Sequence, residues 1–175
     1  MPARLLGAVS SQGVAVFRLE TDRDLIESFR PRDRRVIEMP AGITFPLFMR
    51  DYLAWTETSG ARVYLVFTAP GSRKPIGLIF RRDSPDGGAR TSRICDWCHS
   101  YGSSSEVGLL TTDVNNHRRV GVSLCVDLRC KEKLEDAADR SGRHPREALA
   151  ELQERMFRFA HEALGIEAEP AAQRD

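Results

Sequence analysis

The chain has 175 residues, 41% of them hydrophobic and 29% charged, and its 26 Lys and Arg against 25 Asp and Glu give a formal charge of +1. This composition is ordinary for a soluble globular protein of one domain or two small ones, and it excludes collagen-like, wholly disordered and membrane-spanning chains. The charge balance excludes binding of nucleic acid by bulk electrostatics, although it leaves room for a locally basic face.

The first block, up to about residue 83, contains several short predicted elements. The apolar run Val14–Leu19 is compatible with a strand or with the start of a helix. Thr21–Phe29 is predicted to be a short helix, capped by one of its first two residues. Asp33–Met39 is predicted to form a short turn, and the apolar, aromatic segment Thr44–Trp55 follows it.

Two plain strand signals come next. Arg62–Thr68 and Pro75–Arg81 are rich in β-branched and aromatic residues. The turn-rich connection Ala69–Lys74 predicts that they form an antiparallel hairpin. The breaker cluster Ser84–Ala89 is predicted to be a surface loop and a soft boundary within the chain.

The four cysteines all lie in one block, as two close pairs. Two residues separate Cys95 from Cys98, and after 26 intervening residues Cys125 and Cys130 follow with four residues between them. Two such pairs, with room for a hairpin between them, are typical of a tetrahedral site with four sulfur ligands. They predict one structural Zn²⁺ ion, whose filled shell has no open position for water.

The absence of targeting signals indicates the cellular compartment of the protein. The start lacks the apolar core of a signal peptide, and no segment approaches the ~20 apolar residues of a membrane span. We therefore expect a cytoplasmic protein, whose clustered cysteines bind metal or do redox chemistry.

The alternatives to a zinc site are buried apolar cysteines, a thioredoxin-like motif and an iron–sulfur cluster. His99 and His117 are weaker ligand candidates, because four sulfurs fill the shell.

The segment between the cysteine pairs is predicted to fold as a hairpin. Glu106–Thr112 and Arg119–Leu124 have the composition of strands, and Asp113–His117 contains turn-forming residues. Asp127 is predicted to cap the following helix, with Cys130 in its first turn, where the helix dipole favours an anionic ligand. A knuckle, a hairpin and a helix in this order make a treble clef.

The last block is predicted to be a long helix. It starts at Pro145, and its apolar stripe, Leu149–Ala163, ends shortly before Gly165 stops the helix. We expect the stripe to pack on the hairpin Arg62–Phe80. The predicted fold class is therefore α+β, with antiparallel β hairpins, a four-cysteine treble-clef zinc finger and a long C-terminal helix.

A family resemblance rests on several segments in one order. These are Arg62–Val66, Pro75–Leu78, Arg93–His99, Gly108–Thr111 and Gly121–Cys130, followed by the final helix. Over roughly Phe29–Leu164 the chain resembles the treble-clef zinc-finger domain of elongation factor G-binding proteins, the FusB-type family. The resemblance implies zinc at all four cysteines. We expect an N-terminal extension over residues 1–28 and a zinc-finger domain over 29–165. The tail over 166–175 is rich in Glu, Ala and Pro, and we expect it to be frayed.

The resemblance also implies a function. The family's best-known members bind elongation factor G and help it leave the ribosome, which protects translation against fusidic acid. They carry a helical-bundle domain ahead of the zinc finger, whereas the residues before Phe29 are too few for one. The resemblance thus implies a module that binds elongation factor G, the ribosome or both, with no membrane or small-molecule partner. A role in fusidic acid tolerance is a further implication.

The sequence favours binding over catalysis. It lacks a P-loop, a nucleophile elbow, a zinc-protease helix and a dinucleotide-binding loop, and Ser103–Ser105 is predicted to be a flexible loop. Aromatic and basic residues near the cysteines are the candidate partner contacts. They are Trp97, His99, Tyr101, Arg118, Arg119, Arg129, Lys131 and Lys133.

Direct binding of ribosomal RNA or another nucleic acid is the alternative function. Arg makes up 23 of the 26 basic residues, which suits phosphate recognition, but Ala89–Gly142 contains eight basic and eight acidic residues. The densest basic run, Arg30–Arg35, is interrupted by Asp33. A third hypothesis is a thiol redox sensor that uses Cys95 and Cys98.

Overall fold

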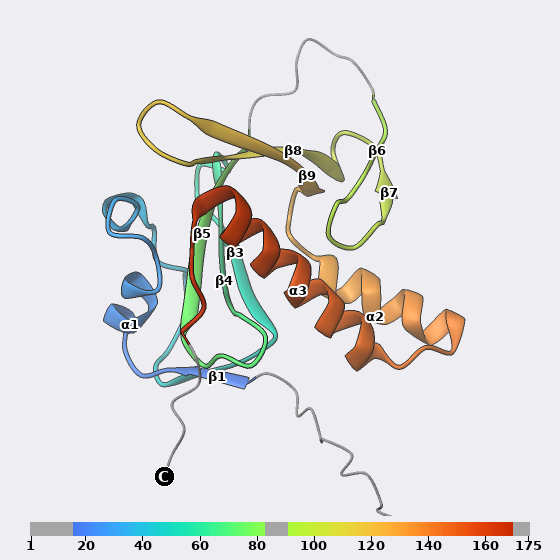
Figure 1. The fold of residues 1–175 in the computed structure, drawn as a ribbon, viewed down its shortest axis with the longest axis horizontal. Helices are drawn as coiled ribbons and strands as arrows, with labels where there is room; N and C mark the ends of the chain where they lie inside the picture. Colours follow the sequence, from blue (N-terminus) through green and yellow to red (C-terminus); the bar gives the residue numbers. More distant parts are fainter. Residues whose placement is uncertain (1–15, 83–90, 170–175) are drawn as a thin grey trace, which may run out of the picture.

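The computed structural model describes residues 16–82 and 91–169 (Figure 1). The boundary loop predicted at 84–89 and the part of the predicted tail beyond residue 169 lie outside these ranges. The sheet at the centre is antiparallel, with strand order β3-β4-β5-β8-β9. Its strands are β3 (Tyr52–Thr56), β4 (Arg62–Thr68), β5 (Pro75–Arg82), β8 (Val107–Asp113) and β9 (Arg119–Cys125).

Both predicted hairpins are confirmed. β4 and β5 pair from Arg62 with Arg81 to Thr68 with Pro75. β8 and β9 pair over their whole length, and the turn between them covers residues 114–118, one residue later than predicted, because Asp113 still pairs with Arg119. The two hairpins join through β5 and β8, which pair over two residues only, Arg81 with Thr111 and Arg82 with Leu110. This short joint places the cysteine block at one end of the β3-β4-β5 part of the sheet (Figure 1).

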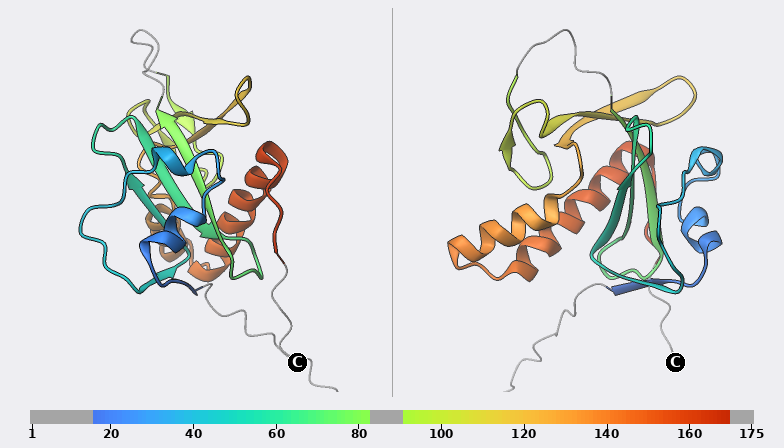
Figure 2. Two further views of the ribbon diagram at one scale, coloured as in Figure 1. Left: turned by 90° about the vertical axis from the view of Figure 1, so that its left-hand side faces the viewer. Right: turned by 180° about the vertical axis from the view of Figure 1, so that it is seen from behind.

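Strand β4 is buried on both faces, which explains its unbroken apolar sequence. Its odd-numbered residues, Val63, Leu65 and Phe67, belong to a core shared with the cysteines and the last helix. Its even-numbered residues, Tyr64 and Val66, belong to a second core, under the N-terminal elements. Figure 2 shows the sheet with the N-terminal elements on one side and the last helix on the other.

The N-terminal layer contains β1 (Val16–Leu19), α1 (Asp22–Glu27), the short 3₁₀ helix η1 (Arg34–Val36) and β2 (Leu47–Arg50). β1 pairs with β2, and Thr21 caps α1 through a capping box with Asp24. The apolar segment predicted at 44–55 is divided at Asp51, whose φ of 71° turns the chain between β2 and β3. Leu19 and Leu25 are fully buried, so β1 and α1 pack into the second core.

The two long helices complete the fold. α3 (Pro145–Leu164) begins and ends as predicted, because the His144 ring accepts a hydrogen bond from the amide of Arg146 and Gly165 adopts φ 67°. Its apolar side packs on the β4–β5 hairpin, and the rings of Phe159 and Phe80 lie 5.9 Å apart. No helix in the described parts of the chain combines the length and the apolar character that crossing a membrane requires.

One predicted cap is wrong. α2 (Cys130–Ser141) has Arg129, not Asp127, at its N-cap, and no side chain caps its first turn. The Asp127 carboxylate instead accepts a hydrogen bond from the amide of Arg129, 3.0 Å away. Cys130 is nevertheless the first residue of the helix, as the sequence predicts.

Candidate metal centre

The first cysteine pair lies in a turn between two short strands, β6 (Arg93–Ile94) and β7 (Tyr101–Gly102). The amide of Cys95 donates to the carbonyl of Ser100, and the amide of His99 donates to the carbonyl of Cys95, each at 2.9 Å. His99 adopts φ 59°, which closes the turn. These bonds bring both sulfurs of the pair to the same side of the knuckle.

The second pair spans the end of β9 and the start of α2. Cys125 is the last residue of the strand and Cys130 is the first of the helix. Between them the amide of Leu128 donates to the carbonyl of Cys125 at 3.0 Å, and Leu128 adopts φ 53°. This tight turn lets two cysteines five residues apart face one point.

The four sulfurs lie within 4.8 Å of one another and all four residues are buried. The sulfurs of Cys95 and Cys130 are 3.7 Å apart, and those of Cys98 and Cys125 are 3.5 Å apart. A tetrahedron with Zn–S bonds of about 2.3 Å has edges of about 3.8 Å. The spacing therefore fits a tetrahedral ion with four sulfur ligands.

The four thiols strongly affect the pKa values of one another. Hydrogen bonding with Cys125 is the largest cause that lowers the pKa of Cys95, to about 7, and it also lowers the pKa of Cys98. The same interaction raises the pKa of Cys130. Like charges this close oppose the ionisation of all four thiols, and a bound divalent cation would offset that repulsion.

One positive side chain already contacts the cluster. The Lys133 ammonium donates to Sγ of Cys125 at 3.2 Å. Burial lowers the pKa of Lys133, but the hydrogen bond and the charge of Cys125 outweigh burial, so the pKa is raised. The Ser100 hydroxyl lies 3.3 Å from Sγ of Cys98. Both groups suit a cluster that carries negative charge.

Three residues that the sequence analysis did not identify hold the cluster in place. The hydroxyl of Tyr52, on β3, donates a hydrogen bond to the carbonyl of Leu128 in the turn before Cys130. Arg82 on β5 donates to the carbonyl of Val126 at 3.0 Å. Arg155 on α3 donates to the carbonyl of Trp97 at 2.7 Å. They lie 76, 44 and 58 residues from the residues that they contact. No local sequence pattern marks contacts of this range.

The structure corrects one predicted partner contact. Trp97 is only 2% exposed, and its ring packs edge-on against Phe80 and Phe159 in the core. Its role is therefore to anchor the first knuckle to β5 and α3, because a buried ring cannot contact a partner.

The other seven predicted contacts lie in three places. His99 and Tyr101 are exposed on the knuckle, whereas Arg118 and Arg119 lie at the far end of β9 from Cys125. The three on or beside α2 are engaged within the chain. Arg129 pairs with Glu132, Lys131 with Asp51, and Lys133 with Cys125.

A match to a protein-family model agrees with this geometry. A model of the family described as the FBP C-terminal treble-clef zinc-finger matches residues 23–166. No curated protein matches the chain. Among solved structures, the structure of the fusidic acid resistance protein FusC is similar at 16% identity and a TM-score of 0.48, covering 83% of this chain and 59% of that one. The family match and the four clustered cysteines together show a treble-clef zinc finger with one structural Zn²⁺ ion.

Proposed function

The chain belongs to the family of FBP C-terminal treble-clef zinc-finger domains, and from this membership we propose that it is a non-catalytic module that binds translation elongation factor G, the ribosome or both. The observation that carries the non-catalytic part is the closed centre. Four buried sulfurs fill a tetrahedral shell, which leaves no position where an ion could activate water. The proposed site of action is the cytoplasm, where translation takes place.

We propose Cys95, Cys98, Cys125 and Cys130 as the four zinc ligands. The test is the metal content of the purified protein and of its single Cys→Ser variants. One zinc per chain in the wild type, and loss of zinc or of soluble protein in each variant, supports the assignment. Full zinc content in any variant overturns it for that residue.

The proposed protein-binding surface is the outer side of the first knuckle. Ile94 and Tyr101 are paired across β6 and β7 and are 57% and 73% exposed. His99 lies beside them, also exposed. An exposed aliphatic and aromatic pair on a zinc-stapled turn provides the rigid anchor that protein interfaces use.

The test is a binding measurement between zinc-loaded protein and purified elongation factor G. We expect wild-type binding in the micromolar range or tighter, and at least a tenfold loss for Tyr101→Ala. Phe48→Ala is the matched control, because Phe48 is 62% exposed on β2, in the N-terminal layer. No binding by the wild type, or equal losses in both variants, would contradict the proposal.

Two further functions depend on separate measurements. A role in fusidic acid tolerance requires that binding release the factor from the ribosome, which translation in the presence and absence of the drug measures. A redox sensor requires that mild peroxide release zinc reversibly and change partner binding. Stoichiometric zinc after peroxide treatment rules the sensor out.

A further inference from the structure

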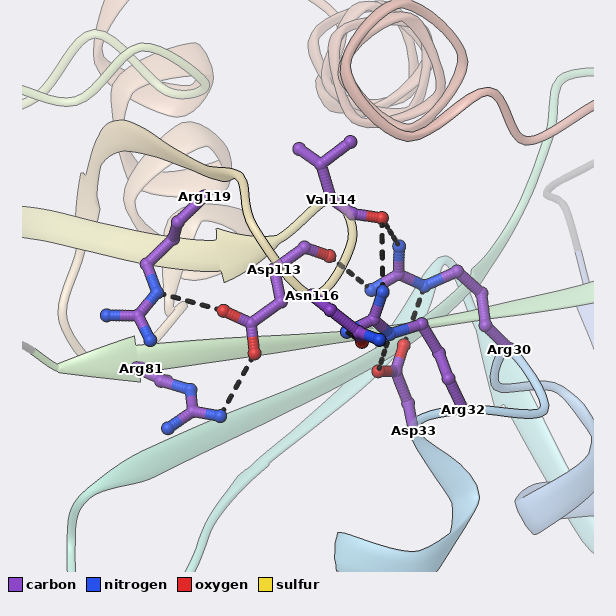
Figure 3. Close-up of polar contacts among 8 residues, drawn as sticks. All are labelled: Arg30, Arg32, Asp33, Arg81, Asp113, Val114, Asn116 and Arg119. Atoms are coloured by element: carbon purple, nitrogen blue, oxygen red, sulfur yellow. Dashed lines mark hydrogen bonds and ion pairs between the residues drawn. The ribbon is translucent and has the colours of Figure 1, made fainter.

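A basic surface lies at the tip of the β8–β9 hairpin, far from the knuckle. Its arginines come from three separate parts of the chain: the segment after α1, strand β5 and the hairpin itself. They are Arg30, Arg32, Arg81, Arg118 and Arg119. The carboxylates of Asp33 and Asp113 lie among them (Figure 3). We call this set the hairpin-tip surface.

The two carboxylates do not neutralise the arginines. Asp113 accepts from Nε of Arg119 at 2.9 Å and from Nη2 of Arg81 at 3.0 Å. Asp33 lies 2.6 Å from Nε of Arg30 and 3.7 Å from Nε of Arg32. Each carboxylate is thus shared by two guanidinium groups. Five arginines and two aspartates leave an excess of three positive charges here, whereas the whole chain has +1.

Hydrogen bonds and ion pairs hold four of the five arginines, Arg30, Arg32, Arg81 and Arg119, in position. Nη2 of Arg30 donates to the carbonyl of Asp113 at 2.6 Å, and Nη1 of Arg32 donates to the carbonyl of Val114 at 3.5 Å. Arg32 also donates to the amide oxygen of Asn116 at 3.2 Å. Arginines that are already ordered lose less side-chain entropy when they bind a ligand. Arg32, Arg81 and Arg119 still expose 35%, 41% and 46% of their side chains.

The chemistry of the surface favours phosphate over a protein partner. Guanidinium groups bind phosphate oxygens in a bidentate way. Among the described residues, the exposed Phe and Tyr rings are those of Phe48 on β2 and Tyr101 on β7, so neither residue type supplies an exposed ring to this surface as an anchor for a protein or for unpaired bases. The hairpin turn instead exposes Asn115, Asn116 and His117. Such polar groups suit the sugar hydroxyls of the shallow groove of an RNA duplex.

We propose that the hairpin-tip surface binds the phosphate backbone of base-paired RNA. The proposal deepens the ribosome arm of the proposed function, because it assigns RNA contact to this surface and leaves the factor to the knuckle. Contact with the phosphate backbone requires no recognition of bases, so we expect RNA binding to be insensitive to the RNA sequence and strongly dependent on salt concentration.

The test uses the full zinc-loaded chain and the fluorescence anisotropy of a labelled 20-base-pair RNA duplex at several salt concentrations. Arg118→Glu is the test variant, because Arg118 is exposed at the turn. Arg146→Glu makes the same charge change on exposed α3 surface and is the matched control. We expect Arg118→Glu to weaken binding at least tenfold at low salt and to reduce the salt slope by about one. Arg146→Glu is expected to bind like the wild type.

The outcomes separate this proposal from factor binding. Retention of elongation factor G by Arg118→Glu, together with loss of duplex RNA, supports the assignment of RNA to the hairpin tip. Absence of duplex binding by the wild type, or equal affinities of both variants, overturns it. Tighter binding of single-stranded RNA than of the duplex also overturns it. The proposal is also overturned if Arg118→Glu no longer binds elongation factor G but binds RNA like the wild type, because the surface would then be a protein interface.

Discussion

The Tyr52 hydroxyl donates a hydrogen bond to the carbonyl of Leu128, 2.5 Å away, and accepts one from the amide of Lys131 at 3.0 Å. Tyr52 is on β3, whereas Leu128 and Lys131 flank the point where Cys130 begins α2. Burial is the main cause that raises the pKa of this phenol, so the hydroxyl keeps its proton and remains a donor. The edge strand of the sheet thus holds the turn of the second cysteine pair.

Replacing Tyr52 with Phe is expected to lower the free energy of unfolding by about 1–3 kcal/mol, because it leaves the buried carbonyl of Leu128 without its donor. Urea denaturation of the zinc-loaded protein measures this. Tyr101→Phe is the control, because Tyr101 is 73% exposed, and it should stay within about 0.5 kcal/mol of the wild type. Equal stability of the two variants would show that the hydroxyl does not hold the turn.

Lys133→Met is expected to weaken zinc binding on the order of tenfold, since it removes the donor to Sγ of Cys125 while keeping the length of the side chain. Competition with a chromogenic chelator measures the affinity. Lys133→Arg keeps the positive charge and should lose less. Lys131→Met is a second control on the same helix, since Lys131 pairs with Asp51 at 3.1 Å. An affinity unchanged in Lys133→Met would mean that the ammonium does not stabilise the thiolates.

Removal of the metal is expected to unfold more than the cysteine block. All four cysteines belong to the same core as Leu65 and Phe67 of β4 and Leu152 of α3. Structural zinc in small domains contributes about 10–16 kcal/mol of binding free energy to folding. Chelation should therefore abolish the near-UV circular dichroism of the buried aromatic rings, and added zinc should restore it. A near-UV spectrum that survives complete chelation would show that the sheet folds without the metal.

The elements that depend on local chemistry could be predicted from the sequence. The clustering of the four cysteines, the β4–β5 hairpin and the start and end of α3 follow from residue spacing and turn signals, and each is confirmed. What could not be predicted depends on contacts between distant residues. Nothing near Tyr52 indicates that its hydroxyl reaches Leu128, and nothing in the run Arg30–Arg35 indicates that it docks on Asp113 and Val114. Asp51 likewise adopts a left-handed φ that its sequence context does not reveal.

Phe29, which follows α1, packs closely against Gly77 of β5. Ser28 accepts a hydrogen bond from the amide of Gly77 at 2.8 Å, and a β-carbon at Gly77 would lie 2.5 Å from the ring of Phe29. Gly77→Ala is therefore expected to destabilise the protein by about 1–3 kcal/mol through overpacking, since both the ring and the strand are buried. Urea denaturation measures the change.

A double-mutant cycle isolates the steric cause of that effect. Phe29→Ala alone should cost about 3–5 kcal/mol, because it leaves a cavity against Tyr64 and Trp55. With the ring gone, the added methyl group at position 77 has space. The double variant should then be more stable than the sum of the two single losses predicts, by about 1 kcal/mol or more. Strict additivity would mean that Gly77→Ala acts on the backbone of β5 rather than on Phe29.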